Sequence, residues 1–176
     1  MHTAVRAANR LTARWASEVR AGTVFSAAGV WPLLALLADG AAGAAREELE
    51  EALGLPAGQA GAAAREFLAT LTGIDGLSSA PGLWTARFVE LREEWTARLP
   101  VGAHGVLTGD AAADEGALDA WATERTGGAI GRVRVEPVPD TALVVASALD
   151  PLRPPGRPAR RGLPACATPP RGGAVR

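Results

Sequence analysis

Few residues in this sequence have side chains that could act as a nucleophile, a base or a metal ligand. The single cysteine, Cys166, would need a base held nearby, and neither His2 nor His104 occupies a position that suggests one. One cysteine also excludes an intramolecular disulfide. The histidines, Cys166 and the scattered acids lack the spacing of a metal site. We therefore expect Cys166 to be an incidental exposed thiol, and we predict no catalytic residue, no cofactor and no metal.

Pairs of glutamates at 47–48, 50–51 and 93–94 could be interpreted as catalytic carboxylates. Each pair lies in a helical pattern with apolar residues on the opposite side, which is typical of a solvated helix face. A phosphate loop is not indicated either, because Gly127-Gly128 follows a helical pattern instead of opening one. These residues therefore do not point to an enzyme.

Five tryptophans could suggest a ligand-binding box. Three of them recur with other apolar residues at the spacing of a helix core: Trp15, Trp95 and Trp121. A large aromatic side chain at such a position is most simply explained by packing, because its burial contributes strongly to core stability. We therefore expect these tryptophans to be core residues.

The charge distribution is uneven along the chain. All 18 basic residues are arginine, which together with abundant Ala, Gly and Pro indicates a GC-rich, bacterial gene. Residues 151–176 hold six arginines and no acid, so residues 1–150 carry 12 basic and 19 acidic residues, a balance of −7. A basic tail could contact nucleic acid, but this one has no aromatic residues for base stacking, so no nucleic-acid partner is predicted.

No segment has the pattern of a membrane span or a signal peptide. Charges interrupt residues 1–19 throughout, so no apolar leader core is present there. The longest mostly apolar run, 24–38, is about 15 residues long, contains Pro32 and is too short to cross a bilayer. No membrane partner is predicted, and the cellular location stays open.

Apolar residues at helical spacing predict most of the secondary structure. A buried helix should follow Ser26, which could cap it, with Pro32 in its first turn. Further helices are expected over 5–19, 44–53, 61–72, 91–99 and 114–126. Short strands or extended segments are expected over 23–25, 83–89, 101–107 and 130–135, with Trp84 and Phe88 on one strand face.

The segment TALVVASAL at 141–149 has a different pattern. Its nearly unbroken apolar run predicts a strand covered on both faces in the middle of a sheet. Residues 151–176, by contrast, contain seven prolines and six arginines and lack apolar mass, so we expect this tail to be disordered. The predicted fold class is α+β, with one domain over 1–150 and a disordered tail over 151–176.

Several stretches together resemble the serpins, the family of serine protease inhibitors. TVFS at 23–26 runs into LLALLADGAAGAAREELEEALGL at 33–55, which is similar to a serpin strand, buried helix, turn and amphipathic helix. LWTARFVELREEWTARL at 83–99 and ALDAWATERTGGAIGRV at 117–133 follow, and TALVVASAL at 141–149 fits a strand of the serpin central sheet. The matching residues of the 117–133 stretch are Trp121, Arg125, Thr126, Gly128 and Ile130. The order and spacing of these stretches carry the resemblance.

Three positions depart from the serpin pattern. Ala27 follows Ser26 where the family usually has proline, and Gly43-Ala44-Ala45 stands where Gly-x-Thr is common. The family asparagine near Ser147, which helps the central sheet to open in many serpins, is also replaced.

The resemblance implies an α+β fold made of the serpin N-terminal helical region and an incomplete central sheet. It also implies inhibition of a serine protease, in which a cleaved reactive loop inserts into the central sheet as a new strand. That loop would lie beyond residue 176, so we expect this chain to be non-inhibitory, and no bait residue is assigned, Ser26 included. The resemblance stops near Asp150, and the Arg/Pro-rich sequence that follows suggests a frameshifted or degraded serpin gene. A downstream reading frame without a serpin continuation would exclude the frameshift.

Two other functions are alternatives to protease inhibition. The first is an interaction fragment that captures a strand from another chain, or from a second copy of itself, through open sheet edges. The second is an enzyme, for which the sequence offers no site. A strand without neighbours would also make the isolated chain marginally stable or prone to aggregation.

Overall fold

The first half of the chain is built around one helix that is apolar on every side. The computed structural model describes residues 2–19 and 26–151, and in it this helix, α2, runs from Trp31 to Gly40 with Pro32 in its first turn. Its buried residues are Trp31, Pro32, Leu33, Ala35, Leu36 and Ala38. The buried helix is thus confirmed, but Ser26 does not cap it. The Ser26 hydroxyl accepts a hydrogen bond from the Ala28 amide at 3.2 Å, in a turn that precedes the helix.

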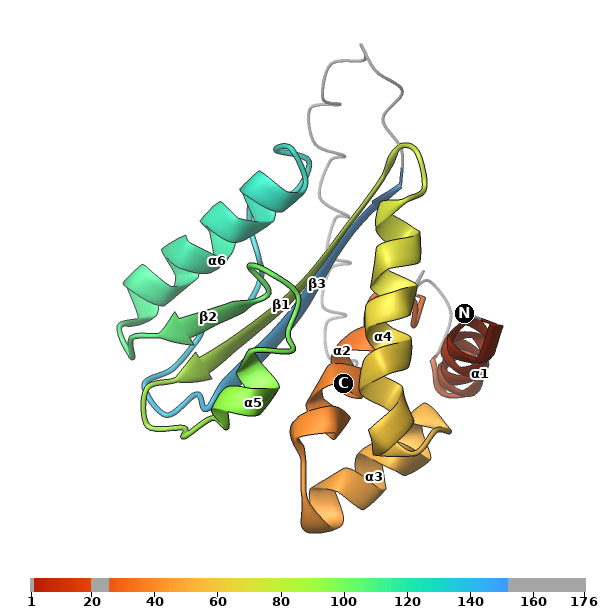
Figure 1. Cartoon of the computed structure of the whole chain (residues 1–176). Coiled ribbons are helices and arrows are strands. Elements are labelled where there is room, and N and C mark those ends of the chain that lie inside the picture. Colours follow the sequence, from red (N-terminus) through yellow and green to blue (C-terminus); the bar gives the residue numbers. More distant parts are fainter. Residues whose placement is uncertain (1, 20–25, 152–176) are drawn as a thin grey trace, which may run out of the picture.

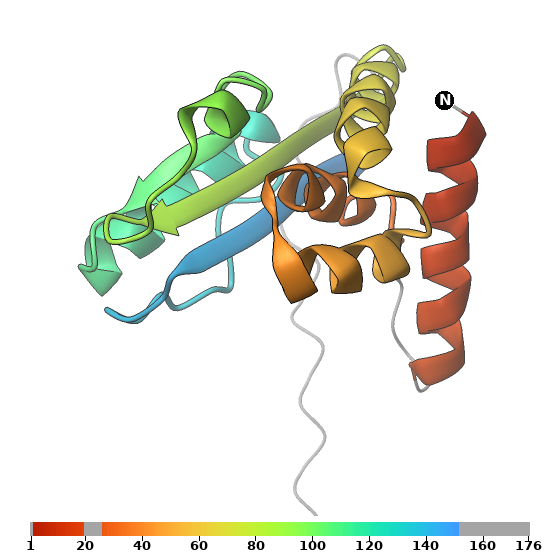
Figure 2. The ribbon, with the colours of Figure 1, turned by 60° about the horizontal axis from the view of Figure 1, so that its bottom comes forward.

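Three more helices surround α2, as Figures 1 and 2 show. They are α1 (His2–Glu18), α3 (Gly43–Leu53) and α4 (Ala57–Thr72), which confirm the helices expected over 5–19, 44–53 and 61–72. Helix α3 stops because Gly54 takes a left-handed conformation with φ of 66°, which glycine adopts without steric cost. The strand expected over 23–25 and the tail after residue 151 lie outside the described residues.

Small side chains let these helices approach α2 closely. Ala4, Ala7 and Ala8 of α1 are buried, and so are Ala60 and Ala64 of α4. The largest side chain in this core is Trp31, which is fully buried and meets Phe67 edge to face with ring centroids 6.0 Å apart. Its indole N–H donates to the carbonyl of Leu53 at 3.4 Å. One aromatic pair therefore joins α2, α3 and α4.

The second half of the chain forms a mixed sheet of three strands in the order β2-β1-β3. The central strand, β1 (Leu77–Ala86), runs parallel to β2 (His104–Leu107) and antiparallel to β3 (Leu143–Pro151). The register pairs Trp84 with Gly105 on one side and with Val144 on the other. A short helix, α5 (Glu93–Thr96), and a longer one, α6 (Ala111–Arg125), complete the fold.

The sheet has helices on both faces (Figure 1). On one face, Trp84, Leu107 and Val144 pack against Leu118 of α6. Trp121 of α6 meets Trp84 edge to face at 4.8 Å, and Gly82 has no room for a Cβ because the two indole rings lie against it. On the other face, Leu83 packs against Leu33 of α2 and against Trp95 of α5.

Three sequence expectations differ from the structure in their extent. The strand expected over 83–89 begins at Leu77 and ends at Ala86, so Phe88 lies beyond it and is 65% exposed. The helix expected over 91–99 is reduced to the four residues of α5, although Trp95 is buried as predicted. Segment 130–135 forms no strand, and the Val133 amide donates instead to the Asp119 carboxylate of α6 at 2.6 Å.

The expectation that 141–149 is a central strand covered on both faces is wrong for the described residues. Strand β3 lies at the edge of the sheet, and only its Val144 side is well buried, whereas Leu143 and Val145 are 40% and 37% exposed. The strand covered on both faces is β1, where Leu83, Trp84 and Thr85 are all buried. Position in the sheet, and not the apolar run alone, decides which strand is covered.

Candidate functional site

The outer edge of β3 is the feature of this fold that could bind another chain. The Ala86 amide donates to the Ala142 carbonyl at 2.9 Å. In the antiparallel register even-numbered residues lie opposite even-numbered ones, so it is the even-numbered residues of β1 and β3 that hydrogen-bond to each other. The backbone N–H and C=O groups of the odd-numbered residues of β3 therefore point away from β1. These residues are Leu143, Val145, Ser147 and Leu149, together with Pro151, which has a C=O but no N–H group. No strand among the described residues pairs with this side, so the edge can accept an added strand.

The side chains of β3 give the two faces of this edge different characters. Val144 and Ala148 are 6% and 3% exposed, and Val144 packs in the cluster beneath α6. Leu143 and Val145 point to the opposite face, beside Thr85 and Leu83 in the register. There Leu143 contributes to a mostly apolar cleft of about 380 Å³ together with residues of α2, α3 and α5.

A buried carboxylate anchors α6 against the sheet. Asp114 is 3% exposed and accepts hydrogen bonds from the Thr108 amide and hydroxyl, both at 2.8 Å, and from the Gly109 amide at 3.0 Å. Burial acts to raise the pKa of Asp114. The hydrogen bonds from Thr108 and Gly109 outweigh burial and, with the charge of Arg87, leave the pKa below its ordinary value. Asp110 caps the helix by accepting from the Ala113 amide at 2.8 Å.

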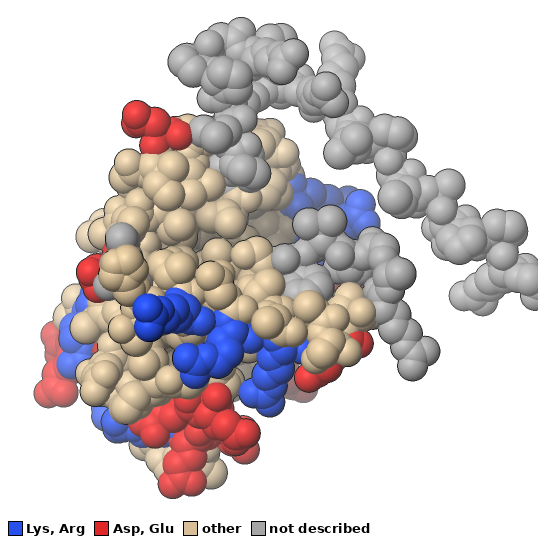
Figure 3. Space-filling model, turned by 90° about the vertical axis from the view of Figure 1, so that its right-hand side faces the viewer, with Lys and Arg blue, Asp and Glu red and all other residues tan. Residues whose placement is uncertain are grey.

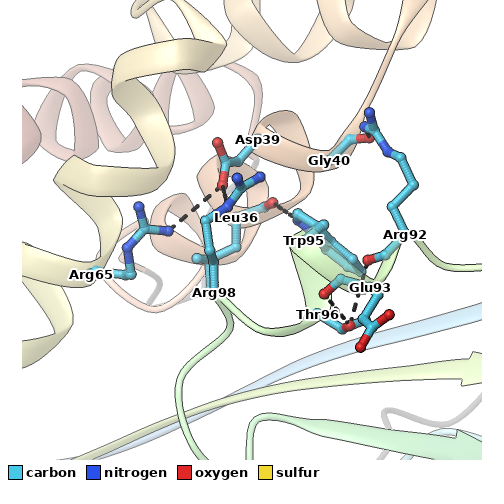
Figure 4. A network of polar contacts seen from close by, with 9 residues as sticks. All are labelled: Leu36, Asp39, Gly40, Arg65, Arg92, Glu93, Trp95, Thr96 and Arg98. Carbon is cyan, nitrogen blue, oxygen red and sulfur yellow. Dashed lines mark hydrogen bonds and ion pairs between the residues drawn. The ribbon is translucent and has the colours of Figure 1, made fainter.

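A polar network joins the helical layer to the segment around α5 (Figure 4). Asp39 at the end of α2 pairs with Arg98 at 3.2 Å and with Arg65 of α4 at 3.6 Å. The Trp95 indole donates to the Leu36 carbonyl at 2.8 Å, and Arg92 donates to the Gly40 carbonyl. These bonds hold the short α5 turn in place, and the sequence did not indicate them because their partners are up to 59 residues apart.

The glutamate pairs do not converge on a site. Glu47, Glu48 and Glu51 of α3 are exposed, and acidic side chains form a group on the helical side of the molecule in Figure 3. Glu50 differs, because it accepts from the Ala57 amide at 2.7 Å and from Arg46 at 3.2 Å. The Ala57 bond, followed by the Arg46 bond, lowers the pKa of Glu50. Glu50 thus supplies a cap that Pro56, at the start of α4, cannot provide from its own side chain.

The other residues that could carry chemistry are dispersed. His2 is exposed at the start of α1, and Cys166 lies outside the described residues. His104 Nε2 lies 2.9 Å from the Thr85 hydroxyl across the β1–β2 pair, a contact that sequence spacing could not reveal. Trp15, Trp95 and Trp121 each pack in or against a core cluster.

Within 2–19 and 26–151, no group of three or more His, Cys, Asp or Glu side chains is arranged to hold a metal ion. In the same ranges, every helix is too short or too polar to cross a bilayer.

Comparison with known proteins identifies the family of the chain. A model of the serpin (serine protease inhibitor) family matches residues 2–149, whereas a search of curated proteins found no match. The fold is similar to that of an Arabidopsis serpin, AtSerpin1 in its native stressed conformation. The TM-score is 0.66 at 22% identity over 81% of this chain and 40% of that one.

Two further serpin structures are also similar in fold to this chain. Serpin-12 of Manduca sexta has a TM-score of 0.70 at 16% identity over 84% of this chain, and the cleaved Serpin 42Da has 0.63 at 17% over 84%. The chain spans between 40% and 44% of the length of these three structures. Because the family model covers most of the sequence, the chain belongs to the serpin family.

Proposed function

We propose that residues 1–150 supply the helical region and one half of the central sheet of a serpin domain that inhibits a serine protease. In the family mechanism a cleaved loop becomes a strand of the central sheet. The outer edge of β3 carries this proposal, because its outward backbone groups could pair with such a strand. Residues 1–176 by themselves encode no segment that we assign as the bait, so the 176-residue chain alone is non-inhibitory.

The experiment is incubation of the 176-residue chain with a panel of serine proteases. We expect every protease to keep its full activity, and we expect denaturing gel electrophoresis to show no SDS-resistant adduct. An intact inhibitory serpin on the same gel serves as the positive control. A stable covalent adduct with the 176-residue chain would refute the proposal, since it would require a reactive loop within this sequence.

A second candidate function is capture of a strand from another polypeptide through the same edge. Leu143 and Val145 are exposed beside the unpaired backbone groups of β3. Strand capture is favoured because an added strand would cover these side chains and pair with these backbone groups. The partner would be a C-terminal serpin segment or, failing that, a second copy of this chain.

Size-exclusion chromatography with a complementing C-terminal serpin fragment tests this candidate. We expect a complex with the fragment that Val145→Pro weakens at least about tenfold, because proline removes an outward N–H and leaves the β1 ladder intact. Val145→Thr keeps that N–H and should bind like the parent chain. Elution as two separate components would count against strand capture, and a homodimer that Val145→Pro abolishes would assign the edge to self-association.

A further inference from the structure

The solvent side of α1 carries a row of three arginines. Arg6, Arg10 and Arg14 follow one another at steps of four residues, and all three are exposed. Each step rises about 6 Å along the helix axis and turns by only about 40°, so the three side chains leave α1 on one side. The core is contacted by a different side of the helix, whose buried residues are Ala4, Ala7, Ala8 and Leu11. Helix α1 is thus held by one side and presents this arginine row on another.

The positive charges of the arginine row are not neutralised by the protein. Within residues 2–19 and 26–151, no carboxylate forms an ion pair with any of the three guanidinium groups. The acid of α1 is Glu18, its last residue. In Figure 3, basic side chains form a band across the side of the molecule where α1 lies, next to the group of acidic side chains. Such a local excess of positive charge attracts an anion, although residues 1–150 are acidic as a whole.

The middle guanidinium of the row is positioned by the end of α3. A Cβ added at Gly54 would lie 3.2 Å from Nη1 of Arg10, so this side chain rests over the residue that follows α3. The last backbone carbonyls of a helix give that end a partial negative charge, which favours a cation there. A guanidinium has five N–H donors and can contact the helix end while it still donates to an anion. Arg10 is therefore oriented before any ligand binds.

The geometry of the row favours a linear chain of phosphates over a nucleic acid. Guanidinium groups bind phosphate oxygens through paired hydrogen bonds, and three of them in line suit a ligand with charges in line. The aromatic residue of α1, Trp15, packs against the helical core, so the helix presents no exposed aromatic ring on which a base could stack. Like charges four residues apart also repel and destabilise a helix, and a bound polyanion would relieve that repulsion.

We propose that Arg6, Arg10 and Arg14 bind linear inorganic polyphosphate, a flexible chain that carries a negative charge on every phosphate and has no bases or sugars. The chain would lie along α1, with guanidinium groups about 6 Å apart contacting phosphates along its length. Figures 1 and 2 show α1 at the outer side of the helical region, with α2 and α4 between it and the sheet. The site is therefore independent of protease inhibition and of strand addition at β3.

Isothermal titration calorimetry of the full chain with short-chain polyphosphate tests the proposal. At low salt, Arg10→Gln should weaken binding about threefold, and the combined Arg6→Gln, Arg10→Gln and Arg14→Gln variant at least about tenfold. The slope of log K against log salt should become shallower by about 0.7 for each arginine removed. Arg134→Gln removes one exposed arginine from the segment after α6 and should leave the affinity unchanged. The six arginines of residues 151–176 are present in every variant, so differences between variants report α1.

A charge-conserving variant and a thermal melt separate binding from loss of structure. Lysine at all three positions keeps the charges and should bind within about threefold of the parent chain. Polyphosphate should raise the melting temperature of the parent and lysine variants but not of the glutamine variant, because only a folded α1 aligns the row. Equal effects of Arg10→Gln and Arg134→Gln, or undiminished binding by the glutamine variant, would overturn the proposal. A single-stranded oligonucleotide with as many phosphates that binds as tightly as polyphosphate would also overturn it, by assigning the row to nucleic acid.

Discussion

Replacing Trp31 with alanine should lower the free energy of unfolding by about 4 kcal/mol, within the range measured when a buried tryptophan is truncated. The indole of Trp31 is fully buried, meets Phe67 edge to face and donates to the Leu53 carbonyl. Alanine would leave a cavity where three helices meet, and the Leu53 carbonyl would lose its donor. Because domains of this size are stable by only about 5–15 kcal/mol, this loss would be a large share of the total stability.

Urea denaturation followed by far-ultraviolet circular dichroism measures this effect. Trp31→Phe keeps an aromatic ring near Phe67 and should cost about half as much as Trp31→Ala. Phe88→Ala provides the matched control, since Phe88 is 65% exposed and its truncation should change stability by less than about 0.5 kcal/mol. Equal losses for Trp31→Ala and Phe88→Ala would show that this aromatic cluster does not organise the core.

Replacing Asp114 with asparagine should destabilise the chain by about 2 kcal/mol at neutral pH. The Asp114 carboxylate accepts three hydrogen bonds from Thr108 and Gly109 in a buried position, and hydrogen bonds to charged groups are the stronger class. An asparagine amide offers one acceptor oxygen and turns its NH₂ group toward donors. The loop between β2 and α6 should therefore lose its anchor, and α6 should pack less firmly on Trp84.

The loss of stability caused by Asp114→Asn should be smaller in acid than at neutral pH. The folded pKa of Asp114 is lower than that of the unfolded chain, so its stabilisation is complete above the unfolded pKa of about 3.9 and is lost as pH falls through the folded value. The stability difference between the parent chain and Asp114→Asn should thus shrink on acidification. Urea titrations at pH 7 and below pH 3 measure it, with exposed Asp140→Asn as the control. A difference that stays constant over this range would contradict the proposed role of the charge.

The helices and the family could be predicted from the sequence because their signals are local. Leu49 and Leu53 lie one turn apart, and Gly54 supplies the left-handed stop, so α3 needs no distant partner to be recognised. The order of such local patterns also carried the serpin resemblance, which the family match over 2–149 confirms.

The position of each strand in the sheet was decided by the tertiary structure. The apolar run at 141–149 predicted the central strand, but β3 occupies an edge, whereas β1 is covered on both faces despite containing Pro81 and Gly82. Those two residues are tolerated because Pro81 lies where β2 no longer pairs and Gly82 makes room for Trp84 and Trp121. Likewise, the polar network around Asp39 and Trp95 brings together residues from α2, α4 and α5. Contacts between residues so far apart depend on how the layers pack, and no local periodicity encodes that.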